Sequence, residues 1–396
     1  MDAPKGDPPT RARLAVVAAK VLISAGEASG DLYASSLVQV LQCRHPGIDF
    51  FGCTGPRLRQ AGVRQIVDSA SLAVVGLVEV ITHLPRIRRE FHKLLAAAAR
   101  ERPDAAILTD SAGFHLRVAR RLHAMGIPVV YLVAPQVWAW RQWRLPLMRR
   151  VLSRLLCIFP FEPAFFAKHG IPATYIGHPL SRLVRASASR QELREMFSVP
   201  DGQFLIAVLP GSREGEIERH RPYLEDAMGR IAAALPAKCR FILALPPAAK
   251  MKERFSDSSI QVKEGRTWDI LACADVALAA SGTVTVEACL LGTPLVTFYR
   301  VNRLSWMVGK FLVRVPFFSM VNLIAGRKVI PELIQHDMTG PRLAAEVTAL
   351  LNDGSRRAAM RSDLAEVAAL LASQEDPMEK AATVVEELLA EEMVHV

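Results

Sequence analysis

Cysteine is scarce in this 396-residue sequence and is never paired. The six cysteines stand far apart, form no C-x-x-C motif and have mostly apolar neighbours. They are typical of reduced core residues in a cytosolic chain rather than of a disulfide framework. No group of His and Cys has the spacing of metal ligands, and no D-x-D motif occurs. We therefore expect neither a metal site nor a cofactor.

Long apolar runs are also absent. Residues 1–13 are rich in Pro, Asp and Arg and lack the continuous apolar segment of a signal peptide. The most apolar stretches, 72–81 and 271–291, are interrupted by acids such as Glu79 and Glu287 well before the ~20 residues that a spanning helix needs. The sequence thus predicts a cytoplasmic chain that does not cross a membrane but is able to lie on one.

Neither standard phosphate-binding glycine motif is present, since the sequence contains no G-x-G-x-x-G and no G-x-x-x-x-G-K-[ST]. Their absence argues against a dinucleotide-binding enzyme and a P-loop NTPase. Acidic residues are fewer than basic ones: the sequence has 39 Asp and Glu and 49 Lys and Arg, which gives a net charge of +10. This balance favours an anionic partner, which is nucleic acid, an acidic membrane surface or a phosphorylated substrate.

Short apolar runs alternate with longer segments of helical period along the whole chain, a pattern typical of βαβ units and a parallel sheet. One series of predicted strands is followed by a polar segment at 181–191 and then by a second series. The first series covers 20–25, 105–109, 129–133 and 155–159, with helices near 31–42, 86–99 and 115–124; the second covers 204–209, 240–245, 275–279 and 294–298.

This organisation predicts an α/β fold with two Rossmann-like, doubly wound domains that face a central cleft. The first domain spans 1–180 and the second spans 190–340. Residues 341–396 form C-terminal helices that either pack back on the first domain or are exchanged within a homodimer. Ligands of such sheets bind beyond the carboxyl ends of the strands, so the turns there are where we expect the site.

The first unusual turn is Gly26-Glu27-Ala28-Ser29-Gly30-Asp31, after the first strand. Its two glycines allow a ligand close to the backbone, and Ser29 or Asp31 is placed to cap the helix that follows. Glu27 suits sugar hydroxyls, although a tight strand-to-helix turn alone also explains the glycines.

Two turns in the second half repeat this layout. Ser212 and Arg213 precede a helix that begins near Glu214, and an arginine at a helix N-terminus is suited to a diphosphate, unless it only pairs with a nearby glutamate. The second turn holds Ser281, Gly282 and Thr283, with Glu287 four residues after Thr283 on the same helical face. A carboxylate there can accept both hydroxyls of a ribose, whereas an ordinary capped helix is the alternative.

Asp110 ends an apolar strand of the first half. It is either a general base, if burial raises its pKa, or the cap of the next helix. His178, in a Gly-His-Pro segment, is either a base or phosphate donor or a structural histidine.

Basic and aromatic residues concentrate in the first half. Residues 137–144 interleave three tryptophans with two arginines, and residues 86–150 hold thirteen Lys and Arg against four acids. Together with the apolar segment 72–84, this composition is suited to an anionic lipid surface, with a buried segment and a solvated basic face as the alternative.

Seven motifs, in this order, resemble the lipid-A-disaccharide synthase family, which are inverting glycosyltransferases of the two-domain GT-B type. The resemblance covers nearly the whole chain. The motifs are GEASGD at 26–31, PQVWAW at 135–140, FPFE at 159–162, GHPL at 177–180, LPGSR at 209–213, SGT at 281–283 with Glu287, and PELIQ at 331–335.

The resemblance implies transfer of 2,3-diacylglucosamine from UDP to the 6-hydroxyl of 2,3-diacylglucosamine 1-phosphate, without a metal, on the cytoplasmic face of the inner membrane. The product is a β-1,6 disaccharide, and UDP is released. The implied catalytic residues are Asp110 as base, Glu27 as an acid on the acceptor side, and His178. The implied UDP ligands are Ser212, Arg213, Ser281, Gly282, Thr283 and Glu287, and the implied cleft residues are Ser29, Arg300, Asn322 and Gln335.

Two segments depart from the family pattern. Gly113, Phe114 and His115 stand where the family usually has a second acid followed by Phe-Asn, so Asp110 is the only acid of its loop and His115 is a candidate to share its work. The usual proline before the cleft asparagine is also missing, since Val321 precedes Asn322.

Two other functions compete with this interpretation. Another GT-B enzyme that uses a UDP-N-acetylhexosamine, either a lipid-linked N-acetylglucosaminyltransferase or an epimerase, would share the fold, but the WAW and GHP motifs argue against it. A non-catalytic RNA-binding protein would use the basic stretch and need neither Asp110 nor Arg213. The turns at the strand ends favour a small-molecule site, so we predict that no nucleic acid is bound.

Overall fold

The computed structural model describes residues 19–72, 77–245, 260–302, 306–307 and 315–394. It divides into two compact units. The first unit comprises Met1–Pro179 and Ser373–Val396, and the second comprises Leu180–Ala372. The chain therefore leaves the first unit after Pro179 and returns to it at Ser373.

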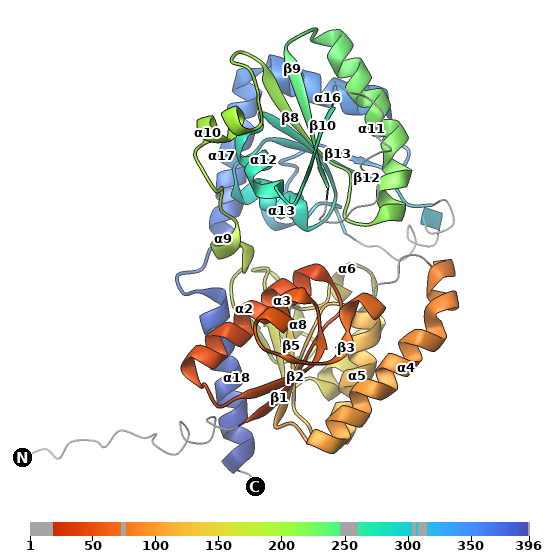
Figure 1. Ribbon diagram of the computed structural model, residues 1–396, viewed down its shortest axis with the longest axis vertical. Helices are drawn as coiled ribbons and strands as arrows, with labels where there is room; N and C mark the ends of the chain where they lie inside the picture. Colours follow the sequence, from red (N-terminus) through yellow and green to blue (C-terminus); the bar gives the residue numbers. More distant parts are fainter. Residues whose placement is uncertain (1–18, 73–76, 246–259, 303–305, 308–314, 395–396) are drawn as a thin grey trace, which may run out of the picture. The chain divides into compact units, whose positions relative to one another are not determined.

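The first unit is built on a parallel sheet whose strand order is β3-β2-β1-β4-β5-β6-β7 in the residues described (Figure 1). The order reverses between β1 and β4, as in a doubly wound Rossmann sheet. The strands are β1 (Lys20–Ala25), β2 (Asp49–Thr54), β3 (Arg64–Asp68), β4 (Ala105–Thr109), β5 (Val129–Leu132), β6 (Arg154–Cys157) and β7 (Ala173–Tyr175).

Helices connect these strands, and the apolar sides of the helices cover the sheet. They are α2 (Ala28–Arg44), α3 (Pro56–Gln60), η2 (Ser69–Ser71), α4 (Leu77–Glu101), α5 (Ala112–Ala124), α6 (Val137–Trp140), η3 (Gln142–Arg144), α7 (Leu145–Val151) and α8 (Glu162–Ala167), with α18 (Pro377–Val394) from the end of the chain.

The second unit repeats this plan. Its described strands form a parallel sheet of order β10-β9-β8-β11-β12-β13, which reverses between β8 and β11. The strands are β8 (Phe204–Leu209), β9 (Cys239–Leu245), β10 (Ile260–Glu264), β11 (Val276–Ala280), β12 (Leu295–Tyr299) and β13 (Glu332–Ile334). The helices are α9 (Leu180–Leu183), α10 (Arg190–Met196), α11 (Glu214–Ala234), α12 (Thr267–Cys273), α13 (Thr283–Leu290), α15 (Met320–Ala325), α16 (Gly340–Asn352) and α17 (Gly354–Leu371).

The α/β fold class predicted from the sequence is confirmed. The predicted strands 20–25, 105–109 and 204–209 have the same bounds as β1, β4 and β8. All residues of β4 and nearly all of β1 and β8 are buried, because strands inside a parallel sheet are covered on both faces. Continuous apolar runs are the sequence pattern of such strands.

The helices after residue 340 divide between the two units. α16 and α17 belong to the second unit, whereas α18 belongs to the first and packs against α2 (Figure 1). Arg44 of α2 pairs with Glu386 of α18 at 2.8 Å, and Arg154 pairs with Glu391 at 2.7 Å. The returning chain also passes close to Gly177, where an added Cβ would lie 2.5 Å from Ser373 Oγ.

Candidate active site

The structure brings Gly26, Glu27 and Asp110 together at the carboxyl edge of the first sheet. Gly26 and Glu27 follow β1, and Asp110 follows β4, its parallel neighbour. The order of strands reverses between these two, and the crevice at such a reversal is where ligands of doubly wound sheets bind. Two turns that lie more than 80 residues apart in the sequence are therefore in contact.

Asp110 holds the two turns together. Its Oδ1 accepts a hydrogen bond from the Gly26 N–H at 2.9 Å, and its Oδ2 accepts one from the Glu27 N–H at 3.0 Å. Asp110 does not cap the next helix, because the N-cap of α5 is Ser111 and no side chain caps it. The capping alternative that the sequence left open is therefore wrong, and the carboxylate points to the N-terminus of α2 instead.

The backbone of Asp110 is strained and is held by buried side chains. Its φ is +55° and that of Ser111 is +33°, in the left-handed region that costs a residue with a Cβ of order 1 kcal/mol. The Asp110 carbonyl accepts hydrogen bonds from the Tyr131 hydroxyl and from His115 Nδ1, the latter at 3.1 Å. These bonds fix the direction in which the carboxylate leaves the strand.

His115 is fully buried and neutral. Since the carbonyl of Asp110 can only accept, the His115 proton sits on Nδ1, and Nε2 accepts from the Ser24 hydroxyl at 2.7 Å. Burial lowers the pKa of His115 to about 4. Both ring nitrogens are engaged, so His115 supports Asp110 through its main chain.

Two effects raise the pKa of Asp110 to about 8: burial first, and then the charge of Glu27. The two N–H bonds from Gly26 and Glu27 oppose this shift. The side chain is 13% exposed, so a substrate hydroxyl can still reach it. A carboxyl with a pKa near the working pH is suited to exchange protons with a substrate.

The remaining residues of the first turn are arranged differently from the prediction. Glu27 is the exposed N-cap of α2, and no side chain caps this helix. Asp31 is buried and accepts hydrogen bonds from the backbone of Gly55, Arg57 and Leu58, at the start of α3. The predicted capping of α2 by Ser29 or Asp31 is therefore wrong, because Asp31 faces the next helix; Ser29 is half-buried beside Glu27.

His178 lies in aromatic surroundings at the end of the first unit. Only 2% of the residue is exposed, and its ring centroid is 5.5 Å from that of Phe159 and 6.3 Å from that of Tyr33. Burial lowers the pKa of His178 to about 3, so the ring is neutral. These surroundings favour the structural interpretation of this residue.

Glu162 is a residue whose importance the sequence did not single out, although it ends the FPFE motif. It is fully buried, and it accepts hydrogen bonds from the Trp138 indole and from the backbone of Ile158 and Phe159. Burial raises the pKa of Glu162 to about 7. The Glu162 carboxyl thereby connects the PQVWAW motif to the FPFE motif. The two motifs lie close together because they follow the neighbouring strands β5 and β6.

In the second unit the predicted diphosphate residues lie where β8 leaves the sheet. Ser212 and Arg213 are exposed, and Arg213 is the N-cap of the long helix α11. The turn depends on Gly211, whose φ is +133° and whose added Cβ would lie 2.5 Å from Glu216 Oε2. Glu216 accepts the Ser212 N–H at 3.0 Å. No side chain caps α11, so the N–H groups at its start remain able to bind an anion, while the Glu216 carboxylate occupies the turn before it.

The turn after β11, the neighbour of β8, holds the other predicted UDP ligands. Ser281 donates its hydroxyl hydrogen to the Phe318 carbonyl at 3.0 Å, while Gly282 and Thr283 are exposed at the start of α13. Burial raises the pKa of Glu287 to about 7, against a hydrogen bond from Trp268. These residues and Arg213 lie at the reversal of the second sheet, as Asp110 does in the first.

Arg300 contacts Gln335 directly, and its backbone is held by the buried His220, which was not among the predicted site residues. His220 Nδ1 donates to the Pro210 carbonyl at 2.7 Å, and its Nε2 accepts the Arg300 N–H at 3.1 Å. The Arg300 guanidinium donates to the Gln335 carbonyl at 3.2 Å. The Gln335 amide in turn pairs with both backbone groups of Val301.

Asn322 is fully buried, and its whole amide is hydrogen-bonded inside the second unit. Its Oδ1 accepts from the backbone of Val329 and Ile330, and its Nδ2 donates to the Ile330 carbonyl and to Glu332. Glu332 also accepts the N–H groups of 318 and 319. Asn322 therefore shapes the loop that ends beside Ser281, and its amide has no remaining hydrogen-bonding position for a ligand.

Within the residues that the structure describes, His, Cys, Asp and Glu side chains form no group of three or more that could hold a metal ion. In the same ranges, no helix combines the length and apolar character needed to span a bilayer.

Comparison with known proteins gives one consistent family. A family model described as lipid-A-disaccharide synthetase matches residues 21–387. The chain is 57% identical over 383 residues to a lipid-A-disaccharide synthase of Solibacter usitatus (strain Ellin6076), which covers 95% of this chain and 99% of that protein. The resemblance seen in the seven motifs is confirmed.

Solved structures support the fold. The glycotransferase of kitacinnamycin superposes with a TM-score of 0.64 at 16% identity, over 94% of this chain and 99% of that chain. UDP-GlcNAc 2-epimerase from Neisseria meningitidis superposes with a TM-score of 0.61 at 14% identity, over 94% of this chain and 100% of that chain. At such low identity the likeness shows the two-domain α/β fold of GT-B glycosyltransferases and nothing finer.

Proposed function

Because the chain belongs to the lipid-A-disaccharide synthase family and is a glycosyltransferase, we propose that it joins UDP-2,3-diacylglucosamine to 2,3-diacylglucosamine 1-phosphate. The bond between the acceptor 6-oxygen and the anomeric carbon forms as the bond from that carbon to the diphosphate breaks. UDP leaves with the electron pair, and the product is the β-1,6-linked disaccharide 1-phosphate. Attack opposite the leaving group inverts the anomeric configuration.

Asp110 is the proposed general base, and the observation that carries this assignment is its setting. The carboxyl is held by two N–H groups at the start of α2, and burial and the adjacent Glu27 raise its pKa to about 8. In its ionised form it takes the proton of the acceptor 6-hydroxyl. Glu27, exposed beside it, is placed to bind hydroxyls of the acceptor sugar.

The leaving group is stabilised by the second unit. Arg213, Ser212 and the N-terminus of α11 supply positive charge and N–H donors for the diphosphate, and no metal is required. Ser281, Gly282 and Thr283 add the N-terminus of α13, and Glu287 accepts the ribose hydroxyls.

The other predicted residues take positioning roles in this proposal. His178, Asn322 and Gln335 have side chains packed or hydrogen-bonded within their own units. Arg300 is fixed by Gln335 and by the Tyr223 ring, 4.5 Å from its guanidinium carbon. Ser29 follows Glu27, the residue proposed to bind the acceptor sugar, by two positions in the chain.

Peripheral contact with the cytoplasmic face of the inner membrane is part of the same proposal. The first unit exposes Leu84, Trp140 and Trp143, at 50%, 38% and 62%, and α4 carries exposed arginines. α4 packs on α5, and α5 packs on α7, which follows the two tryptophans. Both substrates carry acyl chains, so an apolar and basic surface suits an enzyme that draws them from a lipid layer. The homodimer stays a prediction.

The first experiment measures UDP release from UDP-2,3-diacylglucosamine in EDTA, with and without the acceptor, for wild type and Asp110→Asn. We expect acceptor-dependent release that survives chelation and falls by about 10²–10⁴ in the variant. Asp104→Asn is the matched control, since Asp104 lies at the other end of β4 and binds the Lys20 N–H.

Two results would count against the proposal. Full activity of Asp110→Asn would move the base to another residue. UDP release from a UDP-N-acetylhexosamine but not from the diacylated donor would favour the alternative GT-B enzyme. The observation in favour of that alternative is the likeness of fold to an epimerase.

A further inference from the structure

A cavity of about 610 Å³ lies in the second unit, at the edge of the sheet opposite to the proposed UDP site. Its lining includes Asp275 and Thr293, which precede β11 and β12, whereas Ser281 follows β11. The strand between them spans roughly 16 Å at about 3.3 Å per residue. The cavity is therefore separate from the residues proposed to bind UDP.

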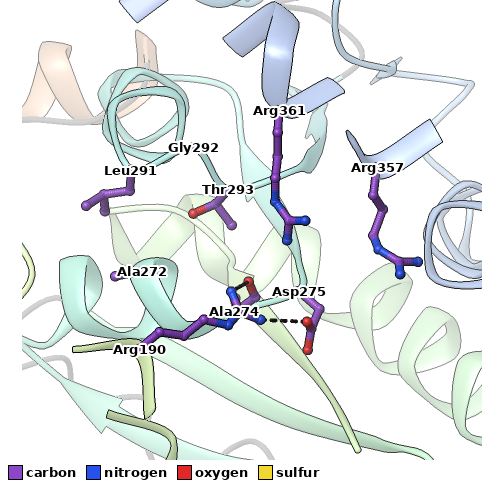
Figure 2. A pocket seen from close by; sticks show the side chains of 9 residues that line it. All are labelled: Arg190, Ala272, Ala274, Asp275, Leu291, Gly292, Thr293, Arg357 and Arg361. Atoms are coloured by element: carbon purple, nitrogen blue, oxygen red, sulfur yellow. Dashed lines mark hydrogen bonds and ion pairs between the residues drawn. The ribbon is translucent and has the colours of Figure 1, made fainter. Parts of the chain in front are cut away.

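Three arginines line this cavity: Arg190 from α10, and Arg357 and Arg361 from α17. Figure 2 shows Arg361 reaching from α17 toward Arg190 and Asp275. The only carboxylate among the lining residues is Asp275.

The charge of Asp275 is already matched by arginines. Its Oδ1 pairs with Arg190 at 2.6 Å, and its Oδ2 pairs with Arg194 at 3.2 Å. Asp275 also accepts the Leu205 N–H, which anchors it at the start of β8. It therefore cannot neutralise the two arginines of α17 as well.

In the part of the chain that the structure describes, neither Arg357 nor Arg361 forms an ion pair with a carboxylate. Arg357 donates to the carbonyls of Leu350 and Leu351 at the end of α16. In the described ranges Arg361 makes neither a hydrogen bond nor an ion pair. Partial burial first, and then the charges of Arg190 and Arg357, lower the pKa of Arg361, and the Asp275 carboxylate opposes this shift only in part. A guanidinium nevertheless stays protonated at neutral pH, so the repulsion between these groups persists until an anion binds.

We propose that this cavity binds a small phosphorylated molecule through Arg190, Arg357 and Arg361. The planar guanidinium group matches a phosphate with paired N–H donors, and it is the side chain that proteins use most for such recognition. The volume falls within the range of about 300–1,000 Å³ usual for small-molecule sites and exceeds the needs of phosphate alone. Leu291 supplies an apolar contact for the organic part. This site is additional to the proposed transfer reaction.

The test measures binding of inorganic phosphate and of glycerol 3-phosphate by calorimetry, at constant ionic strength and with saturating UDP present. We expect both to bind wild type, and Arg361→Gln to weaken both by at least about tenfold, the effect of one charge-assisted hydrogen bond. Arg356→Gln is the matched control: it removes the same charge from the same helix, but Arg356 pairs with Glu346 outside the cavity.

Equal weakening by Arg361→Gln and Arg356→Gln would overturn the proposal, as would the absence of phosphate binding when UDP saturates its own site. Sedimentation with phosphatidic acid vesicles separates the two sources of a phosphate group. Vesicle binding that is lost in Arg361→Gln, with no binding of glycerol 3-phosphate, would reject a soluble ligand and assign the site to a lipid headgroup. UDP release by Arg361→Gln should equal that of wild type, which shows that the variant is folded.

Discussion

Asp110 combines two roles that the sequence presented as alternatives. Its carboxylate oxygens bind the backbone of the turn after β1, so the residue is structural. The Ser111 side chain also binds this carboxylate, and the Asp110 side chain still keeps access to solvent. A carboxylate that orders the acceptor loop and also takes a proton explains why a strained backbone is retained at this position.

The pH dependence of the reaction tests this assignment. With a pKa of about 8, Asp110 is mostly protonated at pH 7, so kcat/KM should rise with pH and level off above that pKa. The charge of Glu27 raises the pKa of Asp110, so Glu27→Gln should move the rising limb to lower pH. The measurement is a pH profile of kcat/KM for both proteins.

If the rising part of the kcat/KM profile lies at the same pH in Glu27→Gln as in wild type, a group other than Asp110 titrates. The same conclusion would follow if the residual activity of Asp110→Asn still rose over this pH range. His115 is not a candidate for this limb, because burial lowers its pKa to about 4.

Asn322 and Gln335 show how far a family resemblance predicts the role of a residue. The resemblance implied that both residues line the cleft; Gln335 directly follows β13, whereas Asn322 lies within the short helix α15. A sequence does not show which groups an amide binds, and here both amides bind the protein's own backbone. His220 and Glu332 were missed for the same reason, since their partners lie 10 or more residues away in the chain.

The contact between helix α2 and strand β4 depends on small residues. Gly30, in the first turn of α2, faces the Asp110 carboxylate, and an added Cβ would lie 1.7 Å from Oδ2. The sequence indicated that glycines bring a ligand near the backbone. The structure shows that at Gly30 the group brought near is a carboxylate of the protein itself.

Gly30→Ala should therefore displace Asp110 and reduce kcat by about a hundredfold, with a loss of stability of about 1–3 kcal/mol from overpacking. Gly229→Ala is the control, because Gly229 is an exposed position of α11 and its added Cβ would meet nothing within 4 Å. The control should be neutral or stabilise by up to about 1 kcal/mol. Urea unfolding and UDP release measure both effects, and wild-type turnover by Gly30→Ala would refute the close contact.

Strands were predicted where the apolar run is continuous. The buried strand β2 lies inside the first sheet but was not predicted, because Asp49, Gly52 and Thr54 interrupt its apolar residues. β1, β4 and β8 are central and apolar, so their runs were visible. The edge strand β3 reads Arg-Gln-Ile-Val-Asp and is largely exposed, so neither an apolar run nor a strict alternation marks it. The extended structure of such an edge strand depends on its pairing with the neighbouring strand more than on its own sequence pattern.

At the scale of the whole molecule, the last helix of the chain, α18, belongs to the first unit, which also contains the N-terminal part of the chain. The periodicity of 341–396 predicted helices but could not show which unit each helix covers, since an apolar face fits either one. Gly177 and the ion pairs of Arg44 and Arg154 specify α18 for the first unit. We therefore expect the stability of the first unit to depend on the last helix.

Leu388→Ala tests this dependence, because Leu388 is 2% exposed on α18. The lost packing should destabilise the first unit by about 2–5 kcal/mol, while exposed Glu387→Ala has little effect. Hydrogen exchange measures the two units separately: amides of β1 should exchange faster in Leu388→Ala, and those of β8 should not. Equal acceleration in both strands would show that the units unfold together.

The distribution of charge over the molecule leads to a test of membrane contact. The region 86–150 carries an excess of nine positive charges, and Arg86, Arg88 and Arg89 of α4 are exposed. Each arginine near an anionic surface contributes about 1 kcal/mol, so replacing the three with Gln should weaken binding to phosphatidylglycerol vesicles by roughly a hundredfold. The control replaces Arg230, Arg327 and Arg342 of the second unit, which removes the same charge from arginines that pair with acids.

Both proteins should bind vesicles less as salt is raised, because screening weakens every exposed charge. Only the α4 variant should lose binding at low salt, since the attraction depends on where the charge lies and the two variants have the same net charge. Equal loss in both variants would mean that net charge alone drives the attraction, and the first unit would then have no special role at the membrane.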